Sequence, residues 1–424
     1  MNPPEKLAPG APPAADFIPL IVPEIGGNEW QYVKECLDTN WVSSVGSYVD
    51  RFEKMLAERA GTKYAIATVN GTAALHIALM LAGVESDDEV VVSSLTFIAP
   101  ANAIRYVGAW PVFIDAEPRY WQINPDAVVD FLEKGCRWDG TSLRNRTTGR
   151  RVKAILPVHI LGHPVDLDPM LEVAAKYSLP VVEDATEGLG ARYRGKNLGS
   201  IGNAGCFSFN GNKIITTGGG GMLVTDNAEW AARARYLTTQ AKDDPIEYVH
   251  NAIGYNYRLT NVLAAMGCAQ MEQLDRFVEV KREIARRYDE SLCSLPGVRL
   301  PEEADWAFGT FWMYTILIDQ SKSQINSREL LRELAIMKIQ TRPLWQPLHR
   351  SPAHNAPGRL PCPNSDALHS QAISLPCSVG LTPAHQGYVI EVLGNLLGKE
   401  AGDLKPGREG RADLSKTQVL PRRP

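Results

Sequence analysis

The sequence lacks the features that mark several large classes of protein. Its seven cysteines are scattered through 424 residues, odd in number and without a C-x-x-C pair. This pattern argues against a disulfide framework and favours reduced thiols in a cytoplasmic protein. No stretch approaches the roughly 20 apolar residues of a membrane-spanning helix, and the N-terminal residues have no apolar core of a secretory signal. We therefore expect a cytoplasmic protein without a membrane partner.

The charge balance lacks a basic excess. Lys and Arg number 44 against 48 Asp and Glu, for a formal net charge of -4 at pH 7. Nucleic-acid-binding domains usually carry a strong basic surplus, so we expect no nucleic-acid partner. The sequence also contains neither the phosphate loop G-x-x-x-x-G-K-[ST] nor the nucleophile motif G-x-S-x-G, which argues against the enzyme classes that depend on them.

The length allows two or three domains, or one large domain with a smaller one attached. Residues 1–16, rich in Pro and Ala, and residues 401–424, polar and charged, are expected to be disordered tails. Between them we expect a large cofactor-binding domain at 17–296, which includes the N-terminal segment, and a small C-terminal α+β domain at 297–400.

Apolar strands alternate with amphipathic helices through the large domain. The expected strands lie at residues 64–69, 89–93, 110–115, 152–158, 181–183, 206–209 and 221–225. The expected helices lie at 71–80, 96–107, 168–177 and, as one long charged helix, 262–292. This alternation predicts an α/β fold with a mostly parallel sheet that is buried on both faces. Such sheets bind their ligands at the carboxyl ends of the strands.

A lysine on a glycine-flanked loop is the most informative feature that the sequence does contain. Lys213 follows small polar residues and precedes a run of four glycines, so a bound cofactor can come close to its amine. Upstream, an apolar strand ends in Glu183 and Asp184. This order fits a pyridoxal phosphate (PLP) site, where Lys213 forms the Schiff base and Asp184 keeps the pyridinium nitrogen protonated. Taken alone, the two residues read as a solvated loop lysine and a helix cap.

A PLP site also needs a phosphate cup and a group that stacks on the ring. Gly71 and Thr72 open a helix after a strand, where backbone N–H groups and a hydroxyl form an anion site. Phe97 begins the next strand–helix turn and is placed to stack on the pyridine face. Ser208 is able to reach the same phosphate, and Glu187 the phenolic oxygen. In isolation these residues read as a helix cap, a core phenylalanine and a surface glutamate.

A metal site is the rival interpretation of one segment. His159 and His163 are four residues apart, with two aspartates nearby. On a helix, this spacing would bring both imidazoles to one face and suit zinc. A glycine and a proline beside His163 make a helix there improbable, so we expect no metal.

Six segments, in order along the chain, resemble the DegT/DnrJ/EryC1/StrS family of sugar aminotransferases. They are Asn70–Leu75, Thr96–Ala99, Val158–Gly162, Glu183–Thr186, Phe207–Lys213 and Gly254–Leu259. The resemblance spans residues 17–397, and the lysine motif with the downstream Gly-Tyr-Asn-Tyr-Arg is its most specific part. The runs at 27–30 and 41–46 resemble the LegC-type branch, whose members are associated with nucleotide-linked 4-keto-6-deoxy-N-acetylhexosamines.

The resemblance implies a fold-type-I PLP-dependent transferase that forms a homodimer with shared active sites. It implies transfer of an amino group from an amino acid, by analogy L-glutamate, to the C4 ketone of a nucleotide-linked 4-keto-6-deoxy (N-acetyl)hexosamine. Such a reaction belongs to the biosynthesis of amino sugars, nonulosonic acids or surface polysaccharides.

The resemblance also assigns roles to individual residues. Lys213 and Asp184 are the expected catalytic residues. Phe97 stands where Trp or Tyr is common, Glu187 stands where Gln or His also occurs, and Asn256 would reach the phosphate of the partner subunit. The expected cofactor-binding set is Gly71, Thr72, Phe97, Asp184, Glu187, Ser208, Asn210, Lys213 and Asn256.

Two other functions stay open: a PLP-dependent nucleotide-sugar dehydratase and a non-catalytic regulatory protein with a PLP fold. Dehydrating relatives carry His at the position of Lys213, which argues against the first. An intact lysine, aspartate and phosphate cup argue against the second. The sequence leaves open the nucleotide (UDP or GDP), the exact sugar, the configuration of the new amine and the residues that contact the sugar, for which Trp312, Arg342 and His349 are candidates.

Overall fold

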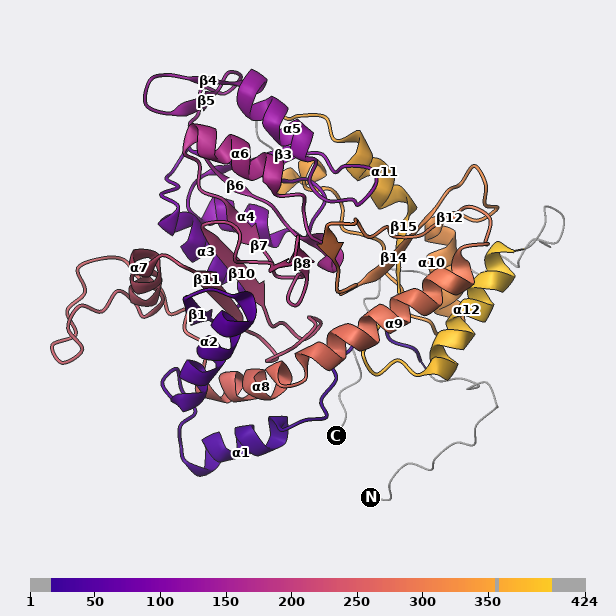
Figure 1. Ribbon diagram of the computed structural model, residues 1–424, viewed down its shortest axis with the longest axis horizontal. Coiled ribbons are helices and arrows are strands. Elements are labelled where there is room, and N and C mark those ends of the chain that lie inside the picture. Colours follow the sequence, from indigo (N-terminus) through magenta and orange to yellow (C-terminus); the bar gives the residue numbers. More distant parts are fainter. Residues whose placement is uncertain (1–16, 355–357, 399–424) are drawn as a thin grey trace.

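A computed structural model describes residues 17–354 and 358–398. The two expected tails, 1–16 and 401–424, lie outside this range. In the described part of the chain, no helix combines the length and the apolar character that crossing a membrane requires. Helices surround a central sheet, and the end of the chain forms a smaller unit beside it (Figure 1).

The central sheet has the strand order β1-β11-β10-β7-β6-β2-β3. Its strands are β1 Tyr64–Thr68, β2 Glu89–Ser93, β3 Trp110–Ile114, β6 Val152–Leu156, β7 Val182–Asp184, β10 Ala204–Ser208 and β11 Gly221–Thr225. Two isolated parallel bridges, one from Ile155 to Val181 and one from Val158 to Asp184, join its two halves at β6 and β7. Only β11 runs antiparallel to its neighbours within this sheet. The predicted α/β fold with a mostly parallel sheet is confirmed.

Alternate residues of the strands enter two different cores, as expected for a sheet that is covered on both faces. In β2, Val91 joins the core that includes the helices α2 (Ser47–Ala60) and α8 (Asn261–Met271), whereas Val90 and Val92 join the core beneath α3 (Gly71–Leu81) and α4 (Ala99–Tyr106). In β11, Met222 and Leu223 divide in the same way. Burial on both faces explains why these strands read as continuous apolar runs.

Twelve α-helices are found in the described residues. They are α1 Glu29–Asp38, α2 Ser47–Ala60, α3 Gly71–Leu81, α4 Ala99–Tyr106, α5 Pro125–Asp130, α6 Asp168–Tyr177, α7 Ala228–Thr238, α8 Asn261–Met271, α9 Leu274–Leu292, α10 Ser327–Ile336, α11 Pro363–Gln371 and α12 Pro383–Leu397. Five short strands lie outside the main sheets: β4 Cys136–Trp138, β5 Leu143–Asn145, β8 Arg192–Tyr193, β9 Lys196–Asn197 and β13 Ala307–Phe308.

The single long helix predicted over 262–292 is wrong, because the chain breaks between α8 and α9. Gln270 and Gln273, on either side of the break, both donate to Glu29 Oε1 of α1, over 2.5 and 3.1 Å. The helix α8 is mostly apolar and packs against α1 and α2, whereas α9 buries only one stripe. The break is explained by these two different burial patterns and by the two glutamines, which bind α1 from either side of it.

The C-terminal unit has a core of its own. Its sheet pairs β14 Tyr314–Ile318 with β12 Val298–Arg299 on one side and β15 Ala372–Leu375 on the other. Residues of α10, α12 and the second half of α9 complete the core, and α9 runs across from the large unit (Figure 1). Ile18, near the start of the described chain, also belongs to this core and pairs with Ile339. The proposed domain boundaries stay predictions.

Candidate functional site

Most of the expected site residues gather at one edge of the central sheet. Because β1, β2, β7 and β10 run in the same direction, the residues that follow them meet at their shared carboxyl edge. A cavity of about 330 Å³ lies there. Seven of the nine expected residues line it, namely Gly71, Thr72, Phe97, Glu187, Ser208, Asn210 and Lys213.

The amine of Lys213 lies between a carboxylate and an aromatic face. Its Nζ is 3.5 Å from Glu187 Oε1 and 4.0 Å from the centroid of the Trp312 ring. The amine therefore has an acidic and an aromatic neighbour. Trp312 is itself fixed, because its Nε1 donates to the carbonyl oxygen of Asn212 over 2.7 Å. The side chain of Lys213 is only 13% exposed, so the amine is both oriented and largely shielded from water.

Two buried carboxylates lie close to this lysine. Asp184 ends β7, is 2% exposed and accepts a hydrogen bond from the backbone N–H of Thr186 over 3.1 Å. Burial raises the pKa of Asp184, although the hydrogen bond from Thr186 and the charge of Lys213 oppose the shift. Burial likewise raises the pKa of Glu187 against the charge of Lys213. A single amine can balance the charge of only one of these two carboxylates. A second positive group would stabilise the other, and a protonated pyridine nitrogen is such a group.

The start of α3 provides an anion site. The side chain of Asn70 caps the backbone N–H of Ala73, and the Ala74 N–H bonds the Asn70 carbonyl. In the described structure no protein acceptor is found for the N–H groups of Gly71 and Thr72, the two cavity-lining residues of this turn. They can bind a phosphate. A Cβ on Gly71 would lie 2.9 Å from the Cβ of Ser208, so a glycine is required for this close approach.

These features fit PLP: an anion-binding helix start, a buried acid, a cavity-facing aromatic side chain and a lysine amine. Asp184 is buried and is not among the residues that line the cavity, but its charge interacts with that of Lys213. The role of each residue in binding the cofactor stays a prediction.

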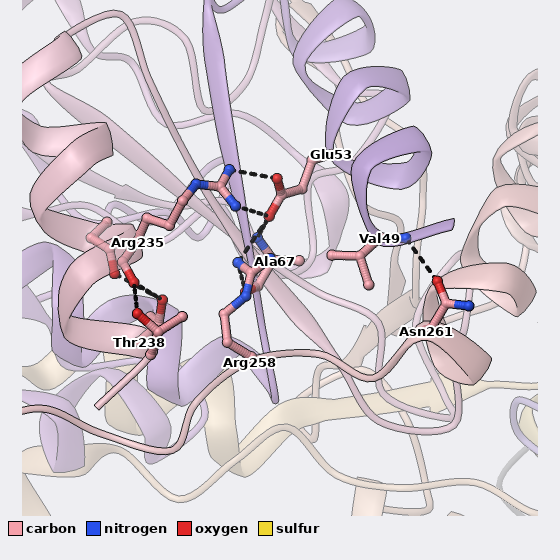
Figure 2. A network of polar contacts seen from close by, with 9 residues as sticks. Val49, Glu53, Ala67, Arg235, Thr238, Arg258 and Asn261 are labelled. Atoms are coloured by element: carbon pink, nitrogen blue, oxygen red, sulfur yellow. Dashed lines mark hydrogen bonds and ion pairs between the residues drawn. The ribbon is translucent and has the colours of Figure 1, made fainter. Parts of the chain in front are cut away.

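Asn256 is not brought to the cavity of its own chain. It is exposed and forms an isolated bridge with Thr239. Arg258 of the same motif turns inward, where its Nη1 donates to Glu53 Oε1 over 2.9 Å and to the Ala67 carbonyl over 3.0 Å (Figure 2). Glu53 Oε2 also accepts from Arg235 Nη2 over 2.6 Å. The arginine of the Gly-Tyr-Asn-Tyr-Arg motif therefore ties the segment before α8 to β1, while the asparagine faces outward.

One of the two histidines of the rival metal interpretation, His159, is engaged by protein groups on both ring nitrogens. His159 Nε2 lies 3.1 Å from Glu183 Oε2, and its Nδ1 accepts from the Val165 N–H over 3.0 Å. Glu183 also accepts three backbone N–H groups between residues 199 and 202. Burial alone would raise the pKa of Glu183, but these hydrogen bonds outweigh it and hold the pKa below its ordinary value. Glu183 therefore links β7 to His159 and to the loop before β10.

Two tryptophans of the cavity are absent from the expected cofactor-binding set. Trp312 enters just before β14, and Trp345 comes from the irregular segment between α10 and α11. Trp312 was one of three open candidates for sugar contact, whereas Arg342 and His349 do not line this cavity. A local motif could not reveal Trp345, because only the folding of the small unit against the sheet brings it there.

Comparison with known proteins agrees with this geometry. The sequence profile of the DegT/DnrJ/EryC1/StrS aminotransferase family matches residues 23–394. EpsN of Bacillus subtilis (strain 168), provisionally named a pyridoxal phosphate-dependent aminotransferase, is 40% identical over 88% of this chain and 94% of its own. The GDP-perosamine synthase of Caulobacter vibrioides is 40% identical over 90% of this chain and 98% of its own. The crystal structure of the aminotransferase TlmJ from Streptoalloteichus hindustanus superposes with a TM-score of 0.82 at 28% identity, covering 90% of this chain and 99% of TlmJ.

Proposed function

The chain belongs to the DegT/DnrJ/EryC1/StrS aminotransferase family, and from this membership we propose which amino group it moves and where. It is a PLP-dependent nucleotide-sugar aminotransferase with the fold-type-I architecture. The proposed acceptor is the C4 ketone of a nucleotide-linked 4-keto-6-deoxy sugar, and the proposed donor is L-glutamate. The similarity to a GDP-perosamine synthase makes GDP the first nucleotide to test, with UDP second. The LegC-type branch and an N-acetyl group on the sugar stay predictions.

One observation carries the proposal. Lys213 lines the same cavity as the start of α3, and the charge of the buried Asp184 interacts with that of Lys213. Bound PLP supplies an electron sink that accepts the electron pair of a bond at the carbon bearing the amino group. The N–H groups of Gly71 and Thr72 would bind the phosphate with the hydroxyl of Ser208. Phe97 would cover one face of the ring.

The acids and the lysine divide the proton chemistry among them. Asp184 holds a proton on the ring nitrogen, since a buried carboxylate is most stable beside a positive charge. Nζ of Lys213 removes the proton from the carbon that bears the amino group of the donor, and later delivers one to C4 of the sugar. Glu187, 3.5 Å from Nζ, orients the amine and would face the phenolic oxygen of the ring.

We also propose that the enzyme is a homodimer and that Asn256 completes the site of the partner subunit. The segment after α7 projects from the body of the molecule (Figure 1) and exposes apolar side chains, with Ile246 81% and Ile253 83% exposed. Apolar side chains presented together on a projecting segment are typical of a protein–protein interface. Asn256 lies just beyond this segment. All seven cysteines are free thiols, which supports the proposed cytoplasmic location.

The direct test is the complete reaction with purified enzyme. L-glutamate is incubated with GDP-linked and UDP-linked 4-keto-6-deoxy sugars, and the products are analysed by mass spectrometry. The proposal predicts a nucleotide-linked amino sugar together with 2-oxoglutarate. A dehydrated sugar would support the dehydratase alternative, and no turnover of any keto-sugar nucleotide with any amino donor would support a regulatory role.

A further inference from the structure

A histidine outside the cavity links two of the segments that build its walls. His349 Nδ1 lies 2.7 Å from the hydroxyl oxygen of Ser94. The backbone N–H of Leu348 donates to the carbonyl oxygen of Ser94, also over 2.7 Å. Ser94 follows β2, whereas His349 belongs to a short 3-10 helix, Leu348–Arg350, between α10 and α11. Two adjacent hydrogen bonds therefore join the large unit and the C-terminal unit at this point.

Both of the joined segments lead to aromatic side chains of the cavity. On one side, Leu95 and Thr96 are buried and Phe97, 53% exposed, lines the cavity. On the other side, Trp345, four residues before His349 in the sequence, lines the same cavity. The distance between Phe97 and Trp345 thus depends on a short path of chain that passes through Ser94 and His349.

The far side of the histidine ring faces α11. His349 Nε2 lies 3.4 Å from Asp366 Oδ1, and Arg350 Nε lies 3.2 Å from the same oxygen. The first turn of α11 is in turn fixed to the end of β3, since the backbone N–H of Ser365 donates to Asp115 Oδ1 over 2.8 Å. The ring is therefore hydrogen-bonded through Nδ1 to Ser94 and lies with its Nε2 side against the carboxylate of Asp366, without a hydrogen bond to it.

The order Ser94, His349, Asp366 matches that of a hydrolytic triad, but the surroundings exclude nucleophilic catalysis. Ser94 is fully buried, and it does not line the cavity. A nucleophilic serine must be reached by its substrate, and this hydroxyl cannot be. A buried hydroxyl instead needs a hydrogen-bond partner, because leaving it unpaired is costly. The cluster is a structural link.

We propose that His349 is a positioning residue of the aminotransferase site, which sets the loop of Phe97 against the segment of Trp345. This inference rests on the proposed function, since Phe97 is the residue expected to cover the cofactor ring. If the link is broken, the two aromatic walls are free to shift relative to each other. Small displacements of a positioning group are known to cost large factors in rate.

Two substitutions of the histidine separate its two contacts. In His349→Asn the amide takes the place of Nδ1 and keeps a partner for Ser94, whereas in His349→Gln the amide takes the place of Nε2 and keeps the contact with Asp366. Ser94→Ala removes the hydroxyl and leaves the histidine. We expect His349→Gln and Ser94→Ala to lower kcat about tenfold, with a smaller effect on the KM for L-glutamate, and His349→Asn to restore most of the rate.

Two further readouts distinguish positioning from stability. In the PLP-free protein, hydrogen exchange of the peptide over residues 94–98 should be faster in His349→Gln and Ser94→Ala than in His349→Asn. With PLP bound, the visible circular dichroism of the cofactor should change in the same two variants. Wild-type exchange and dichroism in both would overturn the proposal, as would equal losses in all three variants. Because exchange is measured without cofactor, it tests the link even if the protein proves to bind no PLP.

Discussion

The indole ring of Trp312 lies 4.0 Å from the amine of Lys213 and donates its own N–H to the backbone beside that lysine, at Asn212. One side chain from the C-terminal unit thereby contacts the lysine and fixes the loop that carries it. The reaction centre is therefore assembled from both units of the chain. The contact between Trp312 and Lys213 predicts how substitutions of Trp312 change the rate.

Replacing Trp312 by Ala should lower kcat by about tenfold, because the amine loses both the aromatic face and the anchored loop. A cation over an aromatic ring is worth about 0.5–2 kcal/mol. Trp312→Phe keeps the face and loses only the N–H, so it should retain more of the rate. Steady-state kinetics with L-glutamate test this order. Equal activity of the alanine and wild-type enzymes would show that the contact has no part in the reaction.

Gly71→Ala should weaken PLP binding by about tenfold. The new Cβ would lie 2.9 Å from the Cβ of Ser208 and 3.1 Å from Thr186 Cγ2, so the start of α3 must move away from the groups expected to bind the phosphate with it. Gly387→Ala, in α12, is the matched control, since an added Cβ there meets nothing within 4 Å. Titration of the cofactor-free protein with PLP measures both. Unchanged affinity in Gly71→Ala would place the phosphate elsewhere.

Glu183→Gln should destabilise the protein at neutral pH by about 3 kcal/mol, because a buried carboxylate that accepts four hydrogen bonds is replaced by an amide with donors of its own. The pKa of Glu183 is lower in the folded state than its ordinary value of 4.5. Its stabilising contribution is therefore fully present above pH 4.5 and is lost as the pH falls through the folded pKa.

Chemical unfolding at a series of pH values tests this. The difference in unfolding free energy between wild type and Glu183→Gln should be constant at and above neutral pH and should shrink below pH 4.5. A difference that grows as the pH falls would contradict the assigned direction of the pKa shift.

The sequence predicts the sheet and most of the site for one reason: both depend on short stretches of chain. Gly71, Phe97, Asp184 and Ser208 follow or end strands of a parallel sheet, so recognising the strands places them at one edge. Trp345 depends on how the C-terminal unit packs on that edge, which no local pattern encodes. The break between α8 and α9 likewise depends on contacts with α1, more than 240 residues away in sequence.

Mixing two inactive variants should restore activity if the sites are shared between subunits. In a hybrid of Lys213→Ala and Asn256→Ala chains, one of the two sites has both an intact lysine and an intact asparagine from its partner. Random exchange of subunits then predicts about a quarter of wild-type activity. A mixture of Lys213→Ala and Ser208→Ala is the control, because both residues belong to the same chain's cavity. No restoration in the first mixture would contradict the proposed role of Asn256.

The central claim is tested most directly by the visible absorption spectrum of the purified protein with PLP, recorded before and after L-glutamate is added. The account predicts a yellow protein whose visible absorption band is lost when L-glutamate is added. It also predicts that the Lys213→Ala variant does not turn over L-glutamate. A protein that stays colourless with added PLP would contradict the account, and so would a Lys213→Ala variant with full activity.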